Sequence, residues 1–429
     1  MASQLLRSTF QQTKKLLGCG SYIKHQRFSI RKQWMSQLPK SGSNHVTPPA
    51  FLNAKNKWLS LQFDEKEKNY PYVWLRDNCK CSECYHEVAS QRLLQFVDLD
   101  IDVEAKSMHV SDTGKDIFIN WSDGHEGFYP LSFLEGEHFP AFSDPLRQLK
   151  QELWGSELQG QIPTFQFSDI LTKDKDLFAW LTALHTKGLT VLQNADCEVG
   201  QIHKVGERVA YLKKTYYGDT YHVMSKLDPS SITYTGAAIN FHSDLCSSYN
   251  QPGMQMLHCI KQSSSGGSNI LADTFKIIPE LQKEEPDVYN TLKNTLFEFT
   301  DIGTEFNDFS FRSSKPAFSY DYEGHLRQVS IHFGRHHSMN VPAEKVYDVY
   351  KALKVFFHYL HKKENMVEYK MSEGDIICMD NRRLVHGRSE YTIDPSIEGV
   401  QRHLEGGYID WDEMNSCYRV LFKRLGKKE

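Results

Sequence analysis

The sequence predicts a mainly β protein with flanking helices, in which a large double-stranded β-helix (jelly roll) follows a small N-terminal β module. Short strand-like runs separated by turn residues recur along most of the chain, and helical periodicity is confined to a few segments. With 429 residues, 40% of them hydrophobic, the chain can bury one large core and a second, smaller one.

The first 45 residues form a leader of different composition. No Asp or Glu precedes Asp64, whereas the leader holds eight Lys and Arg residues interspersed with apolar residues and serines. This pattern is typical of a mitochondrial presequence and predicts a protein of the mitochondrial matrix. The alternative is a disordered basic tail that stays on a cytoplasmic protein. Loss of the leader would change the formal net charge from −4 to −12.

Charge and hydropathy narrow the choice of partners. A net charge of −4 gives no overall basic field that would attract nucleic acid. No apolar run approaches the roughly 20 residues that cross a bilayer, so we expect no membrane partner. The expected partner is a small molecule.

Three regions follow the leader. Residues 51–142 predict the small β module, because short strand-like runs there are separated by turns. Residues 143–161 predict a connector, with a helix at 144–158 in which leucines recur at helical spacing. Residues 162–429 predict the jelly-roll domain.

Within this domain, helical periodicity predicts helices at Asp174–Lys187, 199–214 and 342–362. Short apolar or alternating runs bounded by turn residues predict strands. These strands fall at residues 189–192, 254–258, 269–272, 328–333 and 374–379.

A set of metal ligands is predicted by His242 and Asp244, two positions apart, and by His386 far downstream. On a strand, His242 and Asp244 point to the same face, and His386 on a returning strand can complete the set. Two histidines and one carboxylate leave positions open at Fe(II) for a keto acid and dioxygen. Taken alone, a His-x-Asp pair usually arises by chance. A histidine on a strand is more often a hydrogen-bonded surface residue than a metal ligand.

Arg402 lies sixteen residues beyond His386, where the next strand can present a guanidinium beside the metal. It would pair there with the far carboxylate of 2-oxoglutarate. The alternative is a surface salt bridge with Glu398 or Glu405.

Three of the nine cysteines, Cys79, Cys81 and Cys84, fall within six positions. Together with His125 in a later turn they predict a closed zinc site, which is structural because no ligand position is left for a substrate. His86 is a competing fourth ligand, and three buried free thiols are the alternative. The scattered remaining cysteines fit a reducing compartment better than a disulfide framework.

Tyrosines are dense around these motifs, at Tyr216, Tyr217, Tyr221, Tyr234 and Tyr408. Aromatic faces can surround a quaternary ammonium group, which donates no hydrogen bond. From spacing alone, core aromatic residues of a β domain are the simpler interpretation.

From about Trp58 onward the chain resembles the gamma-butyrobetaine dioxygenase family. The stretches that match are Tyr70-Pro-Tyr-Val-Trp-Leu-Arg-Asp-Asn-Cys79, Trp154-Gly-Ser-Glu-Leu158, Leu257-His-Cys-Ile-Lys-Gln262, Phe299-Thr-Asp-Ile-Gly303, Arg402-His-Leu-Glu-Gly406 and Asp410-Trp-Asp412. The trimethyllysine dioxygenases share the architecture and match fewer of these stretches.

The resemblance implies a homodimeric Fe(II)- and 2-oxoglutarate-dependent enzyme that hydroxylates gamma-butyrobetaine to L-carnitine, with ascorbate as reductant. It implies a 2-oxoglutarate contact at Arg402 and iron ligands at His242, Asp244 and His386. The zinc ligands that it implies are Cys79, Cys81, Cys84 and His125. It also implies a trimethylammonium cage, in place of core aromatics, formed by Tyr217, Tyr221, Tyr234 and Tyr408.

Four positions depart from the family pattern. Ser231 stands where the family carries an Asn for the substrate carboxylate, and Leu245 stands where a Tyr is expected. Asn269 replaces a hydroxyl residue near the cosubstrate, and Tyr221 replaces a Trp with a smaller π face. The alternatives are therefore trimethyllysine hydroxylation, which needs an acidic group for the substrate's α-amino group, and a catalytically silent scaffold.

Overall fold

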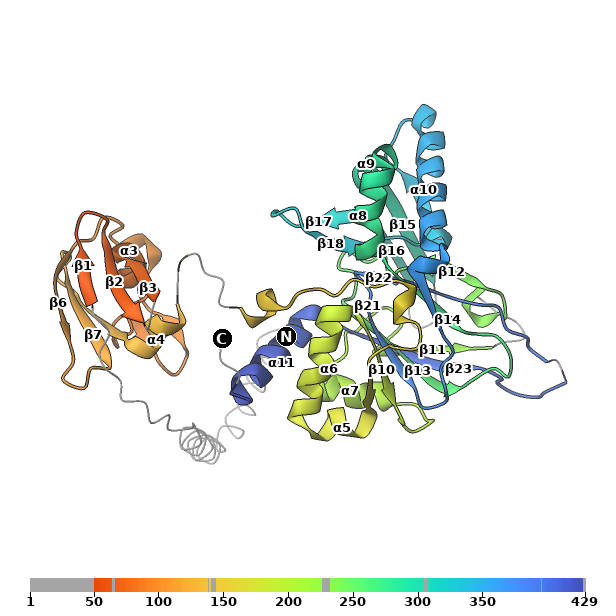
Figure 1. Ribbon diagram of the computed structural model, residues 1–429, viewed down its shortest axis with the longest axis horizontal. Helices are drawn as coiled ribbons and strands as arrows, with labels where there is room; N and C mark the ends of the chain where they lie inside the picture. The colour runs from red at the N-terminus through yellow and green to blue at the C-terminus, as the bar shows by residue number, and fades with distance from the viewer. Residues whose placement is uncertain are drawn as a thin grey trace, which may run out of the picture. The chain divides into compact units, whose positions relative to one another are not determined.

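The structure is a computed structural model (Figure 1) that describes residues 50–63, 66–137, 139, 144–225, 232–303, 308–394 and 396–426. The predicted leader and Ser231 lie outside the described residues. The chain divides into two compact units between Ser143 and Asp144, so the second unit includes nearly all of the segment predicted as a connector. Among the described residues, no helix combines the length and the apolar character needed to cross a bilayer.

The small unit contains two antiparallel three-stranded sheets, ordered β1-β2-β3 and β6-β7-β8. The strands of the two sheets are β1 (Ala50–Asn53), β2 (Trp58–Phe63), β3 (Lys66–Pro71), β6 (Ala105–Val110), β7 (Asp116–Trp121) and β8 (Glu126–Pro130). The other elements are α3 (Tyr72–Asp77), β4 (Tyr85–His86), β5 (Gln91–Arg92), η2 (Phe96–Asp98) and α4 (Leu131–Gly136).

Strand β7 shows why these residues form a sheet with one buried face. Its residues alternate in burial, and Ile117, Ile119 and Trp121 face the core while their neighbours are partly exposed. The indole Nε1 of Trp121 donates to the buried hydroxyl of Tyr129 at 3.1 Å, so the core leaves neither polar group without a partner.

The large unit is built on two facing sheets of a jelly roll. One has six strands in the order β11-β23-β13-β21-β10-β9, and the other has four in the order β12-β22-β14-β20. All neighbouring strands are antiparallel except β9 and β10. Their bounds are β9 (Thr164–Gln166), β10 (Leu189–Gln193), β11 (Thr220–Met224), β12 (Ile239–His242), β13 (Met254–Lys261), β14 (Asn269–Asp273), β20 (Met366–Tyr369), β21 (Ile376–Asp380), β22 (Leu384–Arg388) and β23 (His403–Ile409).

Helices and two smaller sheets surround this pair. The smaller sheets are formed by β15 (Leu296–Gly303), β16 (Phe309–Pro316), β19 (His336–Met339), β17 (Phe318–Tyr320) and β18 (Leu326–Val329). The α-helices are α5 (Phe167–Thr172), α6 (Asp174–Lys187), α7 (Gln201–Val209), α8 (Thr274–Glu284), α9 (Pro286–Asn294), α10 (Val346–Leu360) and α11 (Trp411–Arg424). The 3₁₀ turns are η3 (Pro145–Gln148), η4 (Ser156–Leu158), η5 (Ile232–Tyr234), η6 (Phe333–Arg335), η7 (Ala343–Lys345) and η8 (Lys363–Asn365).

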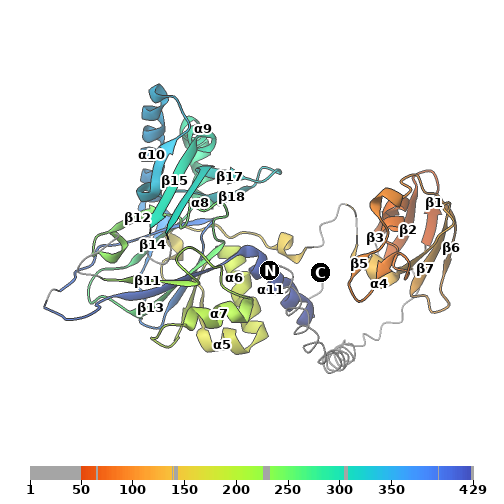
Figure 2. The ribbon, with the colours of Figure 1, turned by 180° about the vertical axis from the view of Figure 1, so that it is seen from behind.

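Two groups of helices cover different parts of the large unit. Figures 1 and 2 show α5, α6 and α7 beside the six-stranded sheet, where their buried side chains share a core with β13 and β21. Helices α8, α9 and α10 gather around β15 and β17 and share a second core with them. Side chains from both jelly-roll sheets pack together in a third core, and other residues of the two sheets line a cavity.

The mainly β fold with a jelly roll is confirmed, and most predicted elements are present. The predicted helix at Asp174–Lys187 is α6, which ends at Gly188 in the left-handed region with φ of 72°. The predicted strands at 189–192, 254–258, 269–272 and 374–379 fall in β10, β13, β14 and β21.

The predicted helix at 144–158 is wrong, because that segment contains only the 3₁₀ turns η3 and η4. Its backbone donors bond to other elements instead. The amide of Glu152 donates to the carbonyl of Thr186 at 2.8 Å, and the amide of Trp154 donates to Asp273 Oδ2 at 3.2 Å. Tertiary hydrogen bonds have replaced the helical ones.

Three other elements are shorter than predicted. The helix expected at 199–214 ends at Val209, and the chain then turns so that the amide of Lys213 donates to the carbonyl of Tyr408 at 2.8 Å. The strand expected at 328–333 ends at Val329, and the helix expected at 342–362 is α10.

Candidate metal centres and active-site cavity

His242, Asp244 and His386 come together between the two strands β12 and β22. His242 and His386 are direct partners in this antiparallel pair. Asp244 Oδ1 lies 3.3 Å from Nε2 of His242 and 4.0 Å from Nε2 of His386, and the three ligand atoms lie within 4.8 Å of one another. One ion could therefore contact all three side chains.

The route by which Asp244 reaches this point differs from the prediction. Strand β12 ends at His242, so Asp244 belongs to the following turn and not to the strand. Asn381 fixes that turn: its Oδ1 accepts from the amide of Asp244 at 2.7 Å, and its Nδ2 donates to the carbonyl of Asp244 at 3.0 Å. The next residue, Leu245, has a positive φ of 56°, a strained backbone that this clamp helps to maintain.

The second carboxylate oxygen of Asp244 is held by hydrogen-bond donors. Oδ2 accepts from the hydroxyl of Tyr408 at 2.6 Å, from Nε2 of Gln255, and from the hydroxyl of Tyr221 at 3.4 Å. Burial alone would raise the pKa of Asp244, but its contacts with the imidazoles of His242 and His386 and the hydrogen bond from Tyr408 hold the pKa well below its usual range. The carboxylate stays ionised and can offer Oδ1 to a cation.

The two histidines are suited to bind a metal through Nε2. Nδ1 of His242 lies 2.9 Å from the carbonyl oxygen of Asn240, which assigns the proton to Nδ1 and leaves the Nε2 lone pair free. Burial lowers the pKa of His386 to about 3, so its imidazole is neutral at physiological pH. Neutral imidazole is the form that ligates metals.

A cavity of about 510 Å³ opens at these three residues. Its wall includes all four tyrosines predicted to form a cage, Tyr217, Tyr221, Tyr234 and Tyr408. The rings of Tyr221 and Tyr408 are stacked with centroids 5.5 Å apart, and the centroids of Tyr217 and Tyr221 are 6.3 Å apart. The tyrosines therefore line the cavity wall instead of filling a core.

Arg402 lies in the same wall, directly before β23, and is 1% exposed. The surface salt bridge with Glu398 or Glu405 considered from sequence is absent among the described residues. Arg402 Nε has no hydrogen-bond partner there, and the guanidinium carbon lies 5.4 Å from the centroid of the Tyr391 ring. A buried cation without an acidic partner is suited to receive an anionic ligand.

Three of the four positions that depart from the family pattern are described, namely Tyr221, Asn269 and Leu245. The buried Asn269 lines the cavity, and its Nδ2 donates to the carbonyl of Tyr369 at 3.3 Å. Leu245 lines the cavity beside Asp244 and offers no hydrogen bond from its side chain. Ser231 falls in a segment outside the described residues.

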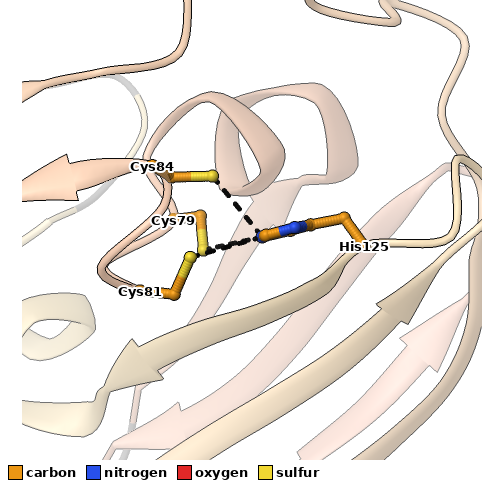
Figure 3. A group of neighbouring side chains, drawn as sticks. All are labelled: Cys79, Cys81, Cys84 and His125. Carbon is orange, nitrogen blue, oxygen red and sulfur yellow. Dashed lines mark hydrogen bonds between the residues drawn. The ribbon is translucent and has the colours of Figure 1, made fainter.

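In the small unit, Cys79, Cys81 and Cys84 direct their sulfur atoms to the Nε2 end of the His125 ring (Figure 3). His125 Nε2 lies 3.4, 3.5 and 3.4 Å from the three sulfur atoms. A tetrahedral zinc ion with Zn–S of about 2.3 Å and Zn–N of about 2.0 Å would place sulfur and nitrogen roughly 3.5 Å apart. The competing ligand His86 lies apart from this cluster, is exposed, and accepts from the amide of Ala89 at 3.0 Å.

Arg76 and Asp123 hold the cluster of three cysteines and His125 in place. Arg76 Nε donates to Asp123 Oδ2 at 2.7 Å, while its Nη1 lies 3.4 Å from the sulfur of Cys84. Asp123 Oδ1 accepts from the amide of His125 at 3.0 Å, which holds the histidine turn against the cysteines. Burial raises the pKa of Cys79 to about 12, so a thiolate there requires the positive charge of a metal.

Comparisons with known proteins fit this geometry. Residues 145–408 match the family described as taurine catabolism dioxygenase TauD, TfdA family, and residues 51–135 match the gamma-butyrobetaine hydroxylase-like N-terminal family. The gamma-butyrobetaine dioxygenase of Homo sapiens is 37% identical over 374 residues, which cover 85% of this chain and 94% of that protein. The chain belongs to the TauD, TfdA dioxygenase family.

Two further proteins that are similar to this dioxygenase differ more in sequence. The mitochondrial trimethyllysine dioxygenase of Mus musculus is 25% identical over 368 residues, which cover 85% of each protein. A solved structure of a taurine dioxygenase from Burkholderia xenovorans is 15% identical, covers 60% of this chain and 89% of that one, and has a TM-score of 0.43. The predicted resemblance and the predicted class, an Fe(II)- and 2-oxoglutarate-dependent dioxygenase, are confirmed.

Several residues of the dioxygenase site were not found from the sequence. His332 packs its ring 4.7 Å from that of His242, and Asp301 and Arg335 line the cavity as an ion pair. Asp301 falls within the matching stretch Phe299–Gly303, but no spacing indicates that it lines the cavity, because these residues reach the cavity only through the packing of β15 and η6 against the jelly roll. Asn381 follows strand β21 directly, and its position in the turn before His386 was the available signal.

Proposed function

We propose that this dioxygenase hydroxylates gamma-butyrobetaine to L-carnitine, with 2-oxoglutarate and dioxygen as co-reactants and succinate and CO₂ as coproducts. One observation carries the proposal: a single cavity is lined by the His242, Asp244 and His386 set, by the buried cation Arg402 and by four tyrosines. A volume of about 510 Å³ suits a small substrate together with a cosubstrate.

His242, Asp244 and His386 would hold the iron. The support is chemical: two imidazoles with Nε2 directed to one point and one ionised carboxylate form the donor set of non-haem Fe(II) oxygenases. When bound, the iron supplies the oxidising power that replaces a C–H bond of the substrate by C–OH. Asn381 holds the backbone of Asp244, and Tyr408 and Gln255 keep its second oxygen occupied, so that Oδ1 remains the ligand atom.

Arg402 would bind the far carboxylate of 2-oxoglutarate. Its burial and its lack of an acidic partner among the described residues support this role, because a carboxylate would satisfy the guanidinium with two charge-assisted hydrogen bonds. Asn269, in the same wall, lies where it would contact the cosubstrate. Ascorbate would act from solution as a reductant that keeps the iron in its ferrous state.

Tyr217, Tyr221, Tyr234 and Tyr408 would surround the trimethylammonium group. Such a group offers no N–H donor, so aromatic faces are the side-chain surface that attracts it without requiring a hydrogen bond. Tyr217, Tyr221 and Tyr408 direct their hydroxyls to carboxylates, so these polar tips are already satisfied. Leu245 and Ser231 would stand at the carboxylate end of the substrate, where they offer fewer hydrogen bonds than the family pattern.

In the small unit, Cys79, Cys81, Cys84 and His125 would bind one structural zinc ion. The match between their sulfur–nitrogen distances and tetrahedral zinc supports this assignment. A closed set of four protein ligands leaves no position for a substrate, so the zinc would stabilise the fold of the small unit.

The test of the proposed function is succinate release by the purified full chain with Fe(II), ascorbate and 2-oxoglutarate. Reactions with gamma-butyrobetaine, with trimethyllysine and without substrate are compared. The proposal predicts stimulation by gamma-butyrobetaine and formation of carnitine. Stimulation by trimethyllysine alone would assign the alternative substrate, and release unaffected by both amines would overturn the proposal.

We further propose that the protein acts in the mitochondrial matrix as a homodimer. The basic, acid-free leader and the mitochondrial name of the trimethyllysine dioxygenase relative support the location. N-terminal sequencing of the protein from isolated mitochondria tests it, and an intact Met1 in a cytosolic fraction would contradict it. Light scattering of the purified enzyme tests the dimer, which a monomeric mass would exclude.

A further inference from the structure

Asp301 is a buried carboxylate in the cavity wall to which the proposed reaction gives no role. It lies on β15 and is 5% exposed. Its Oδ2 accepts from the hydroxyls of Tyr216 and Tyr217, both at 2.9 Å, and its Oδ1 lies 2.5 Å from Nη1 of Arg335. Residues from three separate segments of the large unit therefore meet at one carboxylate.

The hydroxyls of Tyr216 and Tyr217 donate to Asp301, and Tyr217 keeps its proton. Both hydroxyls donate to Oδ2, and the guanidinium of Arg335 forms an ion pair with Oδ1, which accepts no hydrogen bond among the described residues. Burial and the charge of Asp301 raise the pKa of Tyr217 well above its usual value. Tyr217 therefore donates a charge-assisted hydrogen bond, which is stronger than one between neutral groups.

This hydrogen bond changes what the Tyr217 ring presents to the cavity. A phenol that donates to a carboxylate gains electron density in its ring, and the ring face then attracts a cation more strongly. Tyr408 has the same arrangement, because its hydroxyl donates to Asp244 Oδ2 at 2.6 Å. The hydroxyl of Tyr221 also donates to Asp244 Oδ2, at 3.4 Å, so three walls of the cage are backed by carboxylates, one at Asp301 and two at Asp244.

Arg335 and Tyr216, the other two partners of Asp301, stabilise its buried carboxylate. Arg335 balances its charge, which lowers the free-energy cost of keeping a carboxylate in the wall before a substrate arrives. Tyr216 packs its ring against Phe309 and Phe311, with centroids 4.5 and 4.3 Å away, and does not line the cavity. Tyr216 and Tyr217 are therefore a matched pair: both donate to Asp301, and only Tyr217 faces the substrate.

We propose that Asp301 is the positioning residue that makes the cage selective for a permanent cation, because it orients the Tyr217 ring and enriches it in electron density. The inference rests on the proposed function, since it takes a trimethylammonium group as the occupant of the cage. Asp301 acts through Tyr217 and touches no reacting atom.

The test compares two ligands of the same shape. One is gamma-butyrobetaine, and the other is its carbon isostere, in which an uncharged tert-butyl group replaces the trimethylammonium group. Their affinities for the full-length enzyme loaded with Mn(II) and 2-oxoglutarate are measured by calorimetry without oxygen. The ratio of the two affinities reports the attraction for the positive charge and is insensitive to general loosening of the site.

Asp301→Asn should lower this ratio about tenfold, while the KM for 2-oxoglutarate changes less than about twofold. Tyr217→Phe retains the ring, removes the hydrogen bond and should lower the ratio by a similar factor. Combining the two substitutions should lower it no further, because both act through one contact. Tyr216→Phe, the matched control, should keep the wild-type ratio.

The outcomes separate the inference from the function on which it rests. If the wild type binds the two ligands equally, the proposed function fails and the inference fails with it. If the wild type prefers the cation and both Asp301→Asn and Tyr217→Phe keep that preference, the proposed function stands and the inference is overturned. Equal weakening of both ligands by these variants would also overturn it, because it would indicate a structural role.

Discussion

Replacement of Arg402 by Met should separate cosubstrate binding from folding. Arg402 is 1% exposed, its Nε has no hydrogen-bond partner in the described part of the chain, and Met fills a similar volume without charge. Hydrogen bonds to charged groups contribute about 1.5–3 kcal/mol each, and a bound carboxylate would accept two. A loss of about 3 kcal/mol would raise the Kd of 2-oxoglutarate roughly a hundredfold.

Folding stability should change little in the same variant. The attraction between Arg402 and the Tyr391 ring is lost, but the cost of burying an unpaired charge is lost as well. The assays are calorimetric titration of 2-oxoglutarate into Mn(II)-loaded protein and unfolding in urea. Arg327→Met, which replaces an exposed arginine, should leave both unchanged. Wild-type affinity for 2-oxoglutarate in Arg402→Met would refute the assigned role.

Three other predictions concern the zinc ligands, the hydrogen bonds to Asp244 and a buried ion pair. His125→Ala, or removal of zinc by a chelator, should lower the first thermal transition by several degrees in calorimetry of the full chain, and an unchanged transition would argue against a structural zinc. Asn381→Ala removes both hydrogen bonds to the backbone of Asp244 and should lower kcat about tenfold. The circular dichroism spectrum should stay unchanged, and a wild-type kcat would show that the two hydrogen bonds are dispensable. Arg383→Met leaves the carboxylate of Asp273, which is 0% exposed, without its ion pair. The free energy of unfolding in urea should fall by about 3–5 kcal/mol, and a loss under about 1 kcal/mol would contradict the importance of this buried ion pair.

The residues that could be predicted from sequence carry their signal in local spacing. Two ligand types two positions apart, and three cysteines within six positions, restrict the chemistry before the fold is known. Apolar runs bounded by turns located β10, β13, β14 and β21, because these central strands are buried and their pattern is uniform. His386 could be placed beside His242 because a turn and a return strand bring it there.

The residues that could not be predicted depend on contacts between distant segments. Asn381 bonds to Asp244 across 137 positions, and Asp301 accepts from Tyr217 across 84. Neither pair has a spacing that marks it. Asp244 lies in a turn and not on the strand that was expected. Its side chain still converges with that of His242, as the strand periodicity indicated.

The helix wrongly expected at 144–158 has a related cause. The spacing of its leucines is helical, yet Glu152 and Trp154 use their amides for hydrogen bonds to Thr186 and Asp273. Local propensity is a weak preference that such tertiary bonds can override. The sequence alone does not indicate which backbone donors another element will use.

The proposed iron site for gamma-butyrobetaine hydroxylation consists of His242, Asp244 and His386. Its most direct test is gamma-butyrobetaine-stimulated succinate formation in the wild type, in Asp244→Ala and in Asp321→Ala. Asp321 belongs to an acidic surface cluster with Glu323 and His325 and serves as the matched control. The account predicts wild-type stimulation in Asp321→Ala and none in Asp244→Ala. Stimulated turnover that survives in Asp244→Ala would contradict it.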